Sequence, residues 1–450
     1  MAEAVKPGAV ERAVETGLML VYSSLLLLVL VGGAPFWMVR MAVSGRYRAG
    51  LRGRLGVVSA SLREAVRGRE VVWVHAVSVG EVMATAGLVR GLVAARPGLL
   101  VAISTTTQTG QELAKKRMEG MPAFYLPLDF GYAVRRYLRV LRPRMLVLME
   151  SELWPNLLRE CGRAGVPVAV VNARVSDRSY PRYMRFRRLW RPLLERVSVF
   201  LAQGQETAER LRAIGVDENR VRVVGNLKYD LEPATDSAAV GLLQPLLSGR
   251  RLVVAGSTLE GEEELLLDAW GQVLKEAPEA VLLLAPRHPD RFRAVGELAE
   301  GRGQTVYRVS AMREAEMARL APGCVVLLDT IGDLAAVYAL ATVAFVGGSL
   351  VTAGGHNPLE PARFGVPVVI GSSFHNFREI VSMMQAMNGI RVVTSEQMPM
   401  ALRDLLRDEV EARALGGRGG AVFAEQSGAT ERTVEELLRV LGSVGTDGRR

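Results

Sequence analysis

The alternation of apolar and amphipathic segments leaves few folds open to this chain. Beyond Glu70, short apolar runs alternate with longer segments of helical period, which is typical of βα units around a parallel sheet. The stretch LEPATDSAAVGLLQPLLSG separates two series of such runs. The pattern predicts an α/β protein with two Rossmann-like, doubly wound domains facing a cleft. The expected strands are 71–77, 99–105, 145–149, 167–173, 198–203 and 221–225, then 251–256, 280–287, 325–329, 343–348 and 366–371.

A long uncharged segment precedes these domains. Residues 16–39 form 24 positions without a charge, and as a helix they would span about 36 Å against a hydrocarbon core of about 30 Å. We expect an uncleaved membrane-anchor helix here, because acidic residues precede the segment and Pro35 lies where cleavage would be needed. Pro35 leaves two arrangements open, a spanning helix and a helix lying in one leaflet.

A basic neck follows the uncharged segment and contains no acidic residue. By the positive-inside rule, this neck predicts that the rest of the chain lies on the cytoplasmic side. It would also attract anionic lipid head groups. The arginines of the neck are Arg40, Arg46, Arg48, Arg52 and Arg54.

The overall charge is also positive, with 56 Lys and Arg against 47 Asp and Glu. This excess favours an anionic partner, which could be a nucleic acid, a membrane or a phosphorylated substrate. The two cysteines and four histidines have no zinc-site spacing, so no metal or other cofactor is predicted. The chain also lacks D-x-D, the P-loop pattern, G-x-S-x-G and a G-x-G-x-x-G after the first strand, which argues against kinases, serine hydrolases and ordinary dehydrogenases.

A serine and a glutamate follow the first expected strand. Ser78, Gly80 and Glu81 lie in SVGE, and S-x-x-E at a strand-to-helix junction is the pattern of a capping box. A carboxylate at the mouth of a strand is also well placed to act as a general base, and a glycine beside it lets the backbone approach a ligand. The sequence leaves both roles open for Glu81.

A glycine-rich turn follows the expected strand 343–348. In GGSLVTAGGHNPLE, Asn357 is expected as an N-cap, Pro358 at N1 and Glu360 at N3. Such a helix start offers N–H groups and a positive dipole end to a phosphate, and Arg287 after another strand could add a cation. All four histidines lie near strand ends or in comparable loops, which packing alone explains poorly; they are His75, His288, His356 and His375.

Two further strand ends carry charged side chains. Glu150 and Glu152 in MESELWPN would repel each other unless one is protonated or paired with a cation. For Glu152, an exposed helix start is at least as good an explanation. Lys228 in GNLKYD is one of five lysines in the chain and follows the last strand of the first series. It is either a solvated lysine or a group that faces a substrate anion.

Taken together, these motifs resemble those of a known family. They occur in the same order as in the 3-deoxy-D-manno-octulosonic acid (Kdo) transferases of lipopolysaccharide biosynthesis, glycosyltransferase family 30, up to about residue 380. The motifs are HAVSVGE, TTTQTG, YLPLDF, MESELWPN, NARVSDRS, GNLKYD, APRHPDRF, DTIGDL and FVGGSLVTAGGHNPLEPA.

The resemblance implies the GT-B fold and a division of the chain into four parts. Residues 1–45 are the anchor and neck, 46–232 the acceptor domain, 233–248 a linker and 249–450 the donor domain. By analogy with other GT-B folds, the last helix is expected to pack back on the first domain.

The resemblance also implies roles for individual residues. Glu81 corresponds to the catalytic base, and Glu150 and Lys228 to groups that stabilise the transition state. Asp333 departs from the family, which often has Glu there, and puts that single contact in doubt. The residues that match the CMP-binding segments are Pro286, Arg287, Ile331, Gly332, Asp333, Asn357, Pro358, Leu359 and Glu360, with Ser78, Gly80 and His356 as additional candidates.

The implied reaction is an inverting, metal-independent transfer of Kdo from CMP-Kdo to the lipid A precursor (lipid IVA). The enzyme would work at the cytoplasmic face of a bacterial inner membrane. Membrane lipids are expected as further partners, and nucleic acid is not. Addition of one, two or more Kdo residues is known within the family, and the sequence leaves the number open. Two alternatives remain, a GT-B transferase or epimerase using a UDP-sugar, and a membrane-tethered basic protein that binds nucleic acid or anionic lipid.

Overall fold

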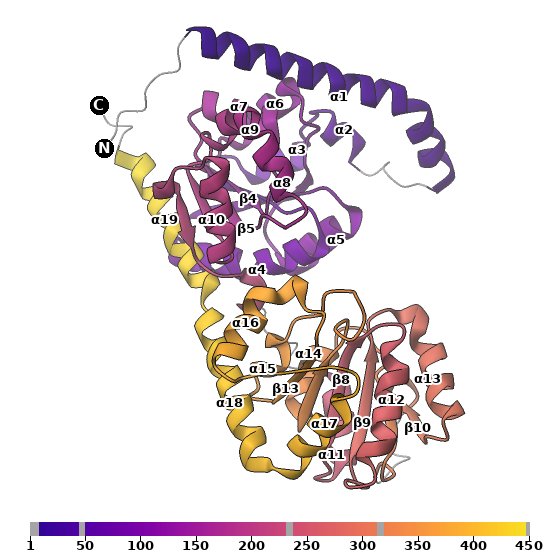
Figure 1. The fold of residues 1–450 in the computed structure, drawn as a ribbon. Coiled ribbons are helices and arrows are strands. Elements are labelled where there is room, and N and C mark those ends of the chain that lie inside the picture. The colour runs from indigo at the N-terminus through magenta and orange to yellow at the C-terminus, as the bar shows by residue number, and fades with distance from the viewer. Residues whose placement is uncertain (1–8, 45–49, 231–236, 313–318, 447–450) are drawn as a thin grey trace. The chain divides into compact units, whose positions relative to one another are not determined.

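A computed structural model describes residues 9–44, 50–230, 237–312 and 319–446. The chain divides into two compact units, which we call unit 1 (Met1–Leu231 and Gly428–Arg450) and unit 2 (Glu232–Ser427). Each unit contains one seven-stranded sheet in which every pair of strands is parallel (Figure 1). The two Rossmann-like units predicted from the sequence are therefore confirmed.

The sheet of unit 1 has the strand order β3-β2-β1-β4-β5-β6-β7. The central strand β1 pairs with β2 from Glu70 opposite Leu99 to His75 opposite Ser104. Nearly all residues of the inner strands are buried, as expected for a sheet covered by helices on both faces. The strands are β1 (Glu70–His75), β2 (Leu99–Thr105), β3 (Ala123–Tyr125), β4 (Met145–Met149), β5 (Val168–Ala173), β6 (Val199–Ala202) and β7 (Val221–Val223).

Helices cover both faces of this sheet. One face carries Trp73, which stacks with Tyr137 and packs against Phe124. The helices that cover this face are α3 (Ala60–Ala65), α6 (Gly131–Leu141), α7 (Pro155–Arg163), α9 (Arg187–Leu194) and α10 (Gln205–Ile214). The other face is covered by α4 (Val79–Ala95), α5 (Gln108–Arg117) and α19 (Ala429–Thr446). Short elements complete the unit: α2 (Leu51–Arg54), α8 (Tyr180–Arg185), η1 (Glu218–Arg220) and η2 (Leu227–Asp230).

The last helix, α19, joins unit 1 although it follows unit 2 in the chain. Leu437 and Leu441 are buried against α4. The Asp230 carboxylate accepts the backbone N–H groups of Gly428 at 2.8 Å and Thr430 at 2.5 Å. Asp230 thus satisfies free N–H groups at the start of α19 and ties this helix to the end of η2.

The sheet of unit 2 has the order β10-β11-β9-β8-β12-β13-β14. Its strands are β8 (Leu252–Thr258), β9 (Val281–Pro286), β10 (Val306–Arg308), β11 (Val325–Leu327), β12 (Val343–Val346), β13 (Val368–Gly371) and β14 (Arg391–Val393). The helices are α11 (Ala238–Leu247), α12 (Glu262–Val273), α13 (Phe292–Gly301), α14 (Leu334–Val337), α15 (Leu359–Ala362), α16 (Arg378–Ala386), α17 (Met398–Arg407) and α18 (Glu409–Gln426), with 3-10 turns η3 (Pro289–Arg291), η4 (Val309–Ala311), η5 (Tyr338–Leu340) and η6 (His375–Phe377).

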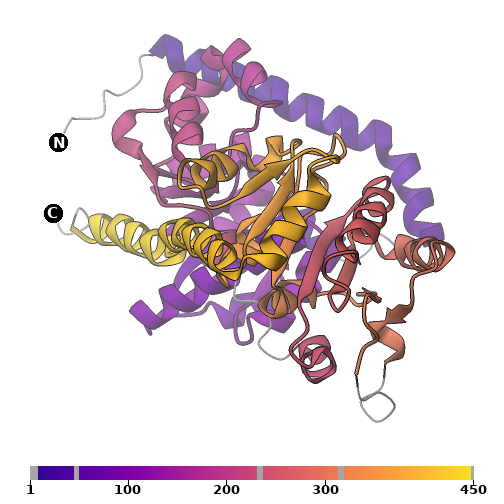
Figure 2. The ribbon, with the colours of Figure 1, turned by 60° about the horizontal axis from the view of Figure 1, so that its bottom comes forward.

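The predicted N-terminal helix is present and continuous. Helix α1 (Ala9–Ser44) contains Pro35 without a break, and Figure 2 shows it as one long helix. Within it, residues 16–43 form a 28-residue segment that is long and apolar enough to cross a membrane, with a mean hydropathy of 2.2 in an 18-residue window. Ser23 accepts a hydrogen bond from the Asn156 side chain at 3.2 Å, so α1 touches α7 of unit 1.

The expected strands agree with the structure except at the sheet edges. Strands β3, β10 and β14, which are edge strands of three residues each, were not predicted. Residues 238–247, within the expected linker, form α11, in which Ser237 accepts the Val240 N–H and Leu243 packs into the core. Arg46 and Arg48 of the neck, and residues 231–236 at the expected domain boundary, lie outside the described residues.

Candidate functional site

In each sheet the strand order reverses at one place, between β1 and β4 in unit 1 and between β8 and β12 in unit 2. The loops that leave the carboxyl ends of such strands diverge and make room for a ligand. Ser78 and Glu81 follow β1 and Glu150 follows β4, so these predicted site residues lie at the switch point of unit 1. The loop after β12, which carries His356 and Asn357, lies at the switch point of unit 2.

Glu81 lies in the first turn of α4 and is 7% exposed. The Ser78 hydroxyl donates to Glu81 Oε1 at 2.8 Å, and the Val77 N–H donates to Oε2 at 2.9 Å. The Glu81 N–H donates in return to Ser78 Oγ at 3.3 Å. This is a variant of the predicted capping box, with Val77 in place of the N-cap backbone. A carboxylate has about four lone-pair positions, so two remain for a substrate hydroxyl.

The turn around Glu81 is not crowded. Among the described residues, nothing lies within 4 Å of the position that a Cβ would take at Gly80. A ligand can therefore approach the backbone there, as the sequence suggested.

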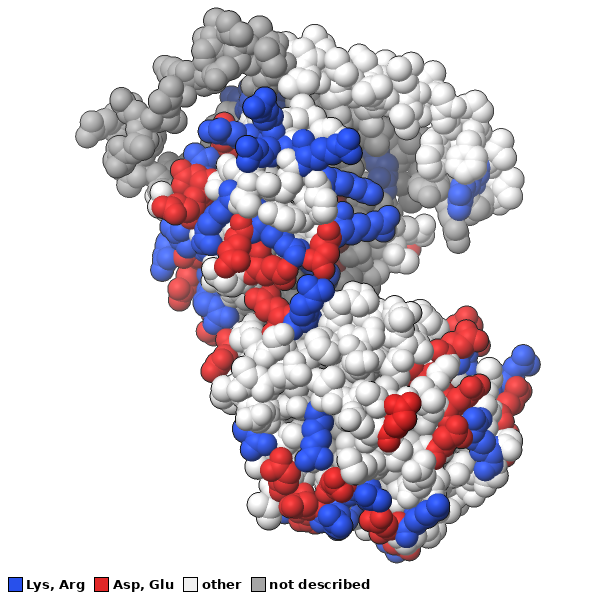
Figure 3. Space-filling model, in the orientation of Figure 1, with Lys and Arg blue, Asp and Glu red and all other residues white. Residues whose placement is uncertain are grey.

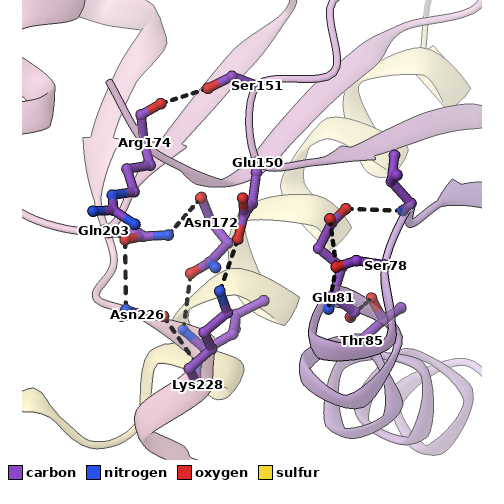
Figure 4. A network of polar contacts seen from close by, with 12 residues as sticks. Ser78, Glu81, Thr85, Glu150, Ser151, Asn172, Arg174, Gln203, Asn226 and Lys228 are labelled. Carbon is purple, nitrogen blue, oxygen red and sulfur yellow. Dashed lines mark hydrogen bonds and ion pairs between the residues drawn. The ribbon is translucent and has the colours of Figure 1, made fainter. Parts of the chain in front are cut away.

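Glu150 has a backbone φ of +56°, in the left-handed region. For a residue other than glycine, this conformation costs roughly 1–2 kcal/mol. Lys228 Nζ lies 2.9 Å from Glu150 Oε1, and the two side chains are 41% and 29% exposed, respectively. Figure 4 shows Lys228 pointing to Glu150, with Glu81 at the neighbouring strand end. Backbone strain at a partly solvated ion pair indicates a functional position, because such a pair adds little stability.

Lys228 is held by a network of amide side chains (Figure 4). Asn172 is fully buried with φ +54°, and its Oδ1 accepts the Leu227 N–H at 3.0 Å. The Asn172 carbonyl oxygen accepts from the Gln203 amide at 2.9 Å, and Asn226 Oδ1 accepts the Lys228 N–H at 3.0 Å. These bonds fix the turn η2. Asn172 lies in NARVSDRS and Asn226 in GNLKYD, but neither residue was predicted to have a role.

Glu152 is half-buried in the structure and is not an exposed helix start. Burial raises its pKa, and the negative charges of Glu81 and Glu150 raise it further. Three carboxylates therefore gather at this edge of unit 1. Lys228 is the cation that pairs with Glu150, one of the two possibilities that the sequence left open.

His75 is the last residue of β1, directly before the loop that carries Ser78, but its side chain lies in the core, which corrects the expectation that packing explains all four histidines poorly. It lies within β1 with no exposed surface, and its Nδ1 is 3.0 Å from the Ser104 carbonyl oxygen. Burial lowers the pKa of His75 to about 4. This histidine is therefore a neutral core residue.

In unit 2, Arg287, His356 and Glu360 lie close enough to influence one another. Burial, together with the charges of Arg287 and His288, lowers the pKa of His356 to about 4. Burial raises the pKa of Glu360, while Arg287 and a hydrogen bond with Asn357 oppose this shift. His356 Nε2 is buried without a hydrogen-bond partner among the described residues. An unpaired imidazole nitrogen beside a guanidinium is suited to an oxygen of an anionic ligand.

The helix expected after His356 is present but short, and it starts one residue later than predicted, with Pro358 and not Asn357 at the N-cap. Asn357 Oδ1 accepts the Leu359 N–H at 3.1 Å, and α15 begins at Leu359 after the buried Pro358. Because α15 has only four residues, the side chains around it must supply most of the charge for an anion.

The remaining predicted donor residues follow β9 and β11. Pro286 ends β9, and the Arg287 N–H donates to the Thr258 carbonyl at 2.9 Å. Ile331 is 82% exposed and Gly332 has φ +97°. Asp333 Oδ1 accepts from Ser237 at 2.8 Å, at the start of α11. Within the described ranges, no hydrogen bond or ion pair joins this loop to Arg287.

Sequence reasoning missed Glu262, which is fully buried at the switch point of unit 2. Its Oε2 accepts the N–H groups of Leu259 at 2.9 Å and Gly348 at 2.6 Å. Its Oε1 accepts those of Ser349 at 2.9 Å and Leu350 at 2.8 Å. Three of these four amides, those of Gly348, Ser349 and Leu350, belong to the glycine-rich turn that was expected to offer free N–H groups to a phosphate. The turn therefore binds a carboxylate of the protein itself, and the groups left for a ligand lie further on, at His356 to Glu360.

Comparisons with known proteins point to one family. Residues 49–231 match the family model described as 3-deoxy-D-manno-octulosonic-acid transferase (kdotransferase). A 3-deoxy-D-manno-octulosonic acid transferase of Haemophilus influenzae is 34% identical over 402 residues, which cover 88% of this chain and 92% of that protein. The enzyme of the same name from Bordetella pertussis is 33% identical over 431 residues, covering 92% and 98%, respectively.

A solved structure resembles the fold at low sequence identity. The crystal structure of UDP-GlcNAc 2-epimerase from Neisseria meningitidis bound to UDP-GlcNAc aligns with a TM-score of 0.58 and 12% identity, covering 82% of this chain and 100% of that one. This likeness shows the fold alone, and it confirms the predicted GT-B class.

Proposed function

This chain belongs to the family of 3-deoxy-D-manno-octulosonic acid (Kdo) transferases, which are glycosyltransferases, and we propose that it transfers Kdo from CMP-Kdo to a lipid A precursor, lipid IVA, in lipopolysaccharide biosynthesis. The observation that carries the proposal is the Glu81 carboxylate at the switch point of unit 1, oriented by Ser78 and Val77 and still able to accept a proton.

Glu81 acts as the general base in this proposal. As the acceptor hydroxyl attacks the anomeric carbon of Kdo, Glu81 takes its proton, and CMP leaves from the opposite face. Attack opposite the leaving group inverts the configuration. Ser78 and Val77 hold the carboxylate in one orientation, so little reorganisation is needed when the proton moves.

Cations and neutral hydrogen-bond donors stabilise the phosphate of the departing CMP. Arg287 and His356 of unit 2 supply donors beside the start of α15, and Glu360 is placed to accept from a ribose hydroxyl. Lys228, held by Glu150 and η2, supplies a further cation. These groups can compensate the leaving charge, so we propose that the transfer step needs no metal ion.

Helix α1 would anchor the enzyme to the bacterial inner membrane. Its apolar segment is long enough to span the bilayer, and the basic side chains that follow favour the cytoplasmic side for the catalytic units. Such an anchor keeps the acceptor site close to a substrate that is itself a membrane lipid.

The test is a mass-spectrometric transfer assay with purified wild type, Glu81→Gln and, as a matched control, Glu112→Gln on α5. CMP-Kdo is generated first, and EDTA is added before lipid IVA. We expect wild type and the control to add Kdo and Glu81→Gln to lose transfer while binding CMP. A Glu81→Gln enzyme that is as fast as wild type would exclude Glu81 as the base, and loss of transfer in EDTA would exclude metal independence.

The UDP-sugar alternative has only the fold in its favour. Competition between CMP and UDP for the wild-type protein separates the two proposals. We expect CMP to bind and UDP to compete weakly, whereas tight binding of UDP alone would favour the alternative. The product mass in the transfer assay also counts the Kdo residues added.

A further inference from the structure

Helices α8 and α9 form a strongly basic segment that the proposed reaction does not use. Residues 178–194 contain six arginines and no acidic residue. The flanking acids are already paired, Asp177 with Arg210 and Glu195 with Arg191. The segment therefore carries an uncompensated positive charge, and Figure 3 shows Lys and Arg side chains gathered on this part of unit 1.

Three of these arginines are fully available to a partner. Arg182, Arg187 and Arg188 are exposed, and in the described part of the chain their guanidinium groups form no ion pair. Because unpaired surface arginines on one segment repel each other, such a cluster is expected where an anionic surface compensates it.

Apolar side chains are exposed between the arginines. Phe186 is 52% exposed and Leu189 is 46% exposed. On the inner side of the same segment, Tyr183 packs edge-on against Trp190 with ring centroids 5.2 Å apart, and both are half-buried against the core of unit 1. The segment thus combines a packed inner side with an outer surface of arginines and large apolar groups. This composition is typical of elements that bind at the head-group level of a membrane.

The segment lies between the anchor helix and the candidate site. Helix α9 packs on α7, and Asn156 of α7 bonds to Ser23 of α1. On the other side, the negative charge of Glu152 contributes to the raised pKa of Tyr183, so α8 also lies near the carboxylates at the switch point. A surface that held α8 and α9 would therefore fix the orientation of the acceptor site.

We propose that α8 and α9 form a second membrane-binding element, which docks on the head groups of anionic phospholipids next to α1. The arginines would pair with lipid phosphates while Phe186 and Leu189 enter the interface. This inference rests on the proposed membrane location of the enzyme, but its test measures vesicle binding and involves no Kdo transfer. A failed transfer assay and a failed docking test are therefore distinguishable.

The first experiment compares flotation of the full-length protein with phosphatidylcholine vesicles and with vesicles that also contain phosphatidylglycerol. The variant Arg182→Gln/Arg187→Gln/Arg188→Gln should bind phosphatidylcholine as wild type does, through α1. Its partition into the anionic vesicles should fall by about tenfold or more, since each arginine near such a surface contributes about fivefold. The wild-type preference for anionic vesicles should weaken as salt is added.

A charge-matched control separates docking from net charge. Arg293→Gln/Arg407→Gln/Arg413→Gln removes three exposed arginines of unit 2 and should retain wild-type binding. The proposal is overturned if the control loses as much binding as the α8–α9 variant, or if neither loses any. It is also overturned if the α8–α9 arginines matter only for vesicles that contain lipid IVA, because the segment would then bind the acceptor.

A second measurement does not depend on the triple variant being well folded. Phe186→Cys is labelled with an environment-sensitive fluorophore, while the native Cys161 and Cys324 are buried. We expect a blue shift of the emission on addition of anionic vesicles, and none for the same label at Met400→Cys, an exposed position of unit 2. Absence of a shift at position 186 would show that this surface stays in water.

Discussion

The two units place a glutamate at the same topological position, yet the two carboxylates have different surroundings. Glu81 and Glu262 each lie in the first turn of the helix that follows the strand at the switch point. Glu81 accepts two hydrogen bonds from its own turn and keeps some exposure. Glu262 accepts four N–H groups, three of them from the loop after β12, and has no exposed surface.

In the proposed function, the same position therefore serves structure in unit 2 and chemistry in unit 1. The oxygens of Glu262 are saturated by backbone donors, so its charge organises the glycine-rich turn and is closed to a ligand. Glu81 is oriented but not saturated, and two further carboxylates, Glu150 and Glu152, lie beside it. Both carboxylates occupy the same place in the fold, so the number of hydrogen-bond donors around each one separates the two roles.

Changing Glu81 should have the strongest effect, and it tests whether this carboxylate acts in transfer and not in stability. Glu81→Gln should lower the transfer rate by about 10²–10⁴, the usual contribution of a general base. The melting temperature should stay within about 1 °C, because the amide oxygen can accept from Val77 and the amide N–H can donate to Ser78. Transfer kinetics and calorimetry on the same preparation check both parts. A clear loss of stability would give Glu81 a structural role like that of Glu262.

Glu262→Gln should show the opposite behaviour and mainly destabilise unit 2. One amide oxygen cannot accept four N–H groups, and the new NH₂ group would face backbone donors. We expect a loss of roughly 3–5 kcal/mol in the free energy of unfolding and a melting temperature lower by about 10 °C. The exposed Glu264→Gln is the matched control and should change stability by less than about 0.5 kcal/mol. Equal stability of the two variants would show that the four bonds are not critical.

The next effect concerns two histidines whose pKa is lowered to about 4. Burial is the largest cause at both, and at His356 the charges of Arg287 and His288 lower the pKa further. Because folded His75 binds fewer protons than the unfolded chain, its contribution to stability is lost as the pH falls from 6.5 towards 4. Between pH 7 and pH 5 this loss is about 2 kcal/mol.

Denaturant unfolding of wild type and His75→Gln at pH 7 and pH 5 checks the difference. The variant should lack this part of the pH dependence. A constant difference in stability between the two proteins at both pH values would contradict the buried, neutral state of His75. For His356, added salt should raise the pKa, since salt screens the cations that help to lower it.

The smallest effect tests backbone strain at the two switch points. Glu150 and Ser257 have φ values of +56° and +57°. Replacing either by glycine should stabilise the protein by about 1 kcal/mol, because glycine adopts this conformation without strain. Glu150→Gly should also lose transfer activity, whereas Ser257→Gly should retain most of it. Glu150→Ala separates strain from the lost ion pair and should be less stable than Glu150→Gly.

Much of the fold could be predicted because the inner strands are long and uniformly apolar. Strands such as 99–105 and 145–149 agree with the structure to the residue. The three missed strands are outer strands of three residues each, where pairing with a neighbour decides the conformation. Helix α11 was hidden in a stretch with Pro245 and Gly241, because its stability comes from core packing of Leu243 and Leu246.

Contacts in the candidate site could be predicted where both partners lie in the same turn of the chain. The bond between Ser78 and Glu81 follows from their spacing, so it was found. Glu262 bonds to amides 86 to 88 residues away, and no local pattern indicates such a contact. A run of three acidic residues after a strand was the only signal. Asn172 was missed for the same reason, since its partner Leu227 is 55 residues further along the chain.

The return of α19 to unit 1 has a consequence for the order in which the protein is made. All strands of unit 1 are translated before unit 2. Leu437 and Leu441, which cover one face of the unit 1 sheet, are translated only at the end of synthesis. Unit 2 can therefore finish folding first, while α1 has been available to the membrane throughout. During translation, unit 1 of the nascent chain is incomplete, and the apolar surface of α4 that α19 will cover is still exposed. Chaperones or the bilayer surface would have to protect that face until the last helix arrives.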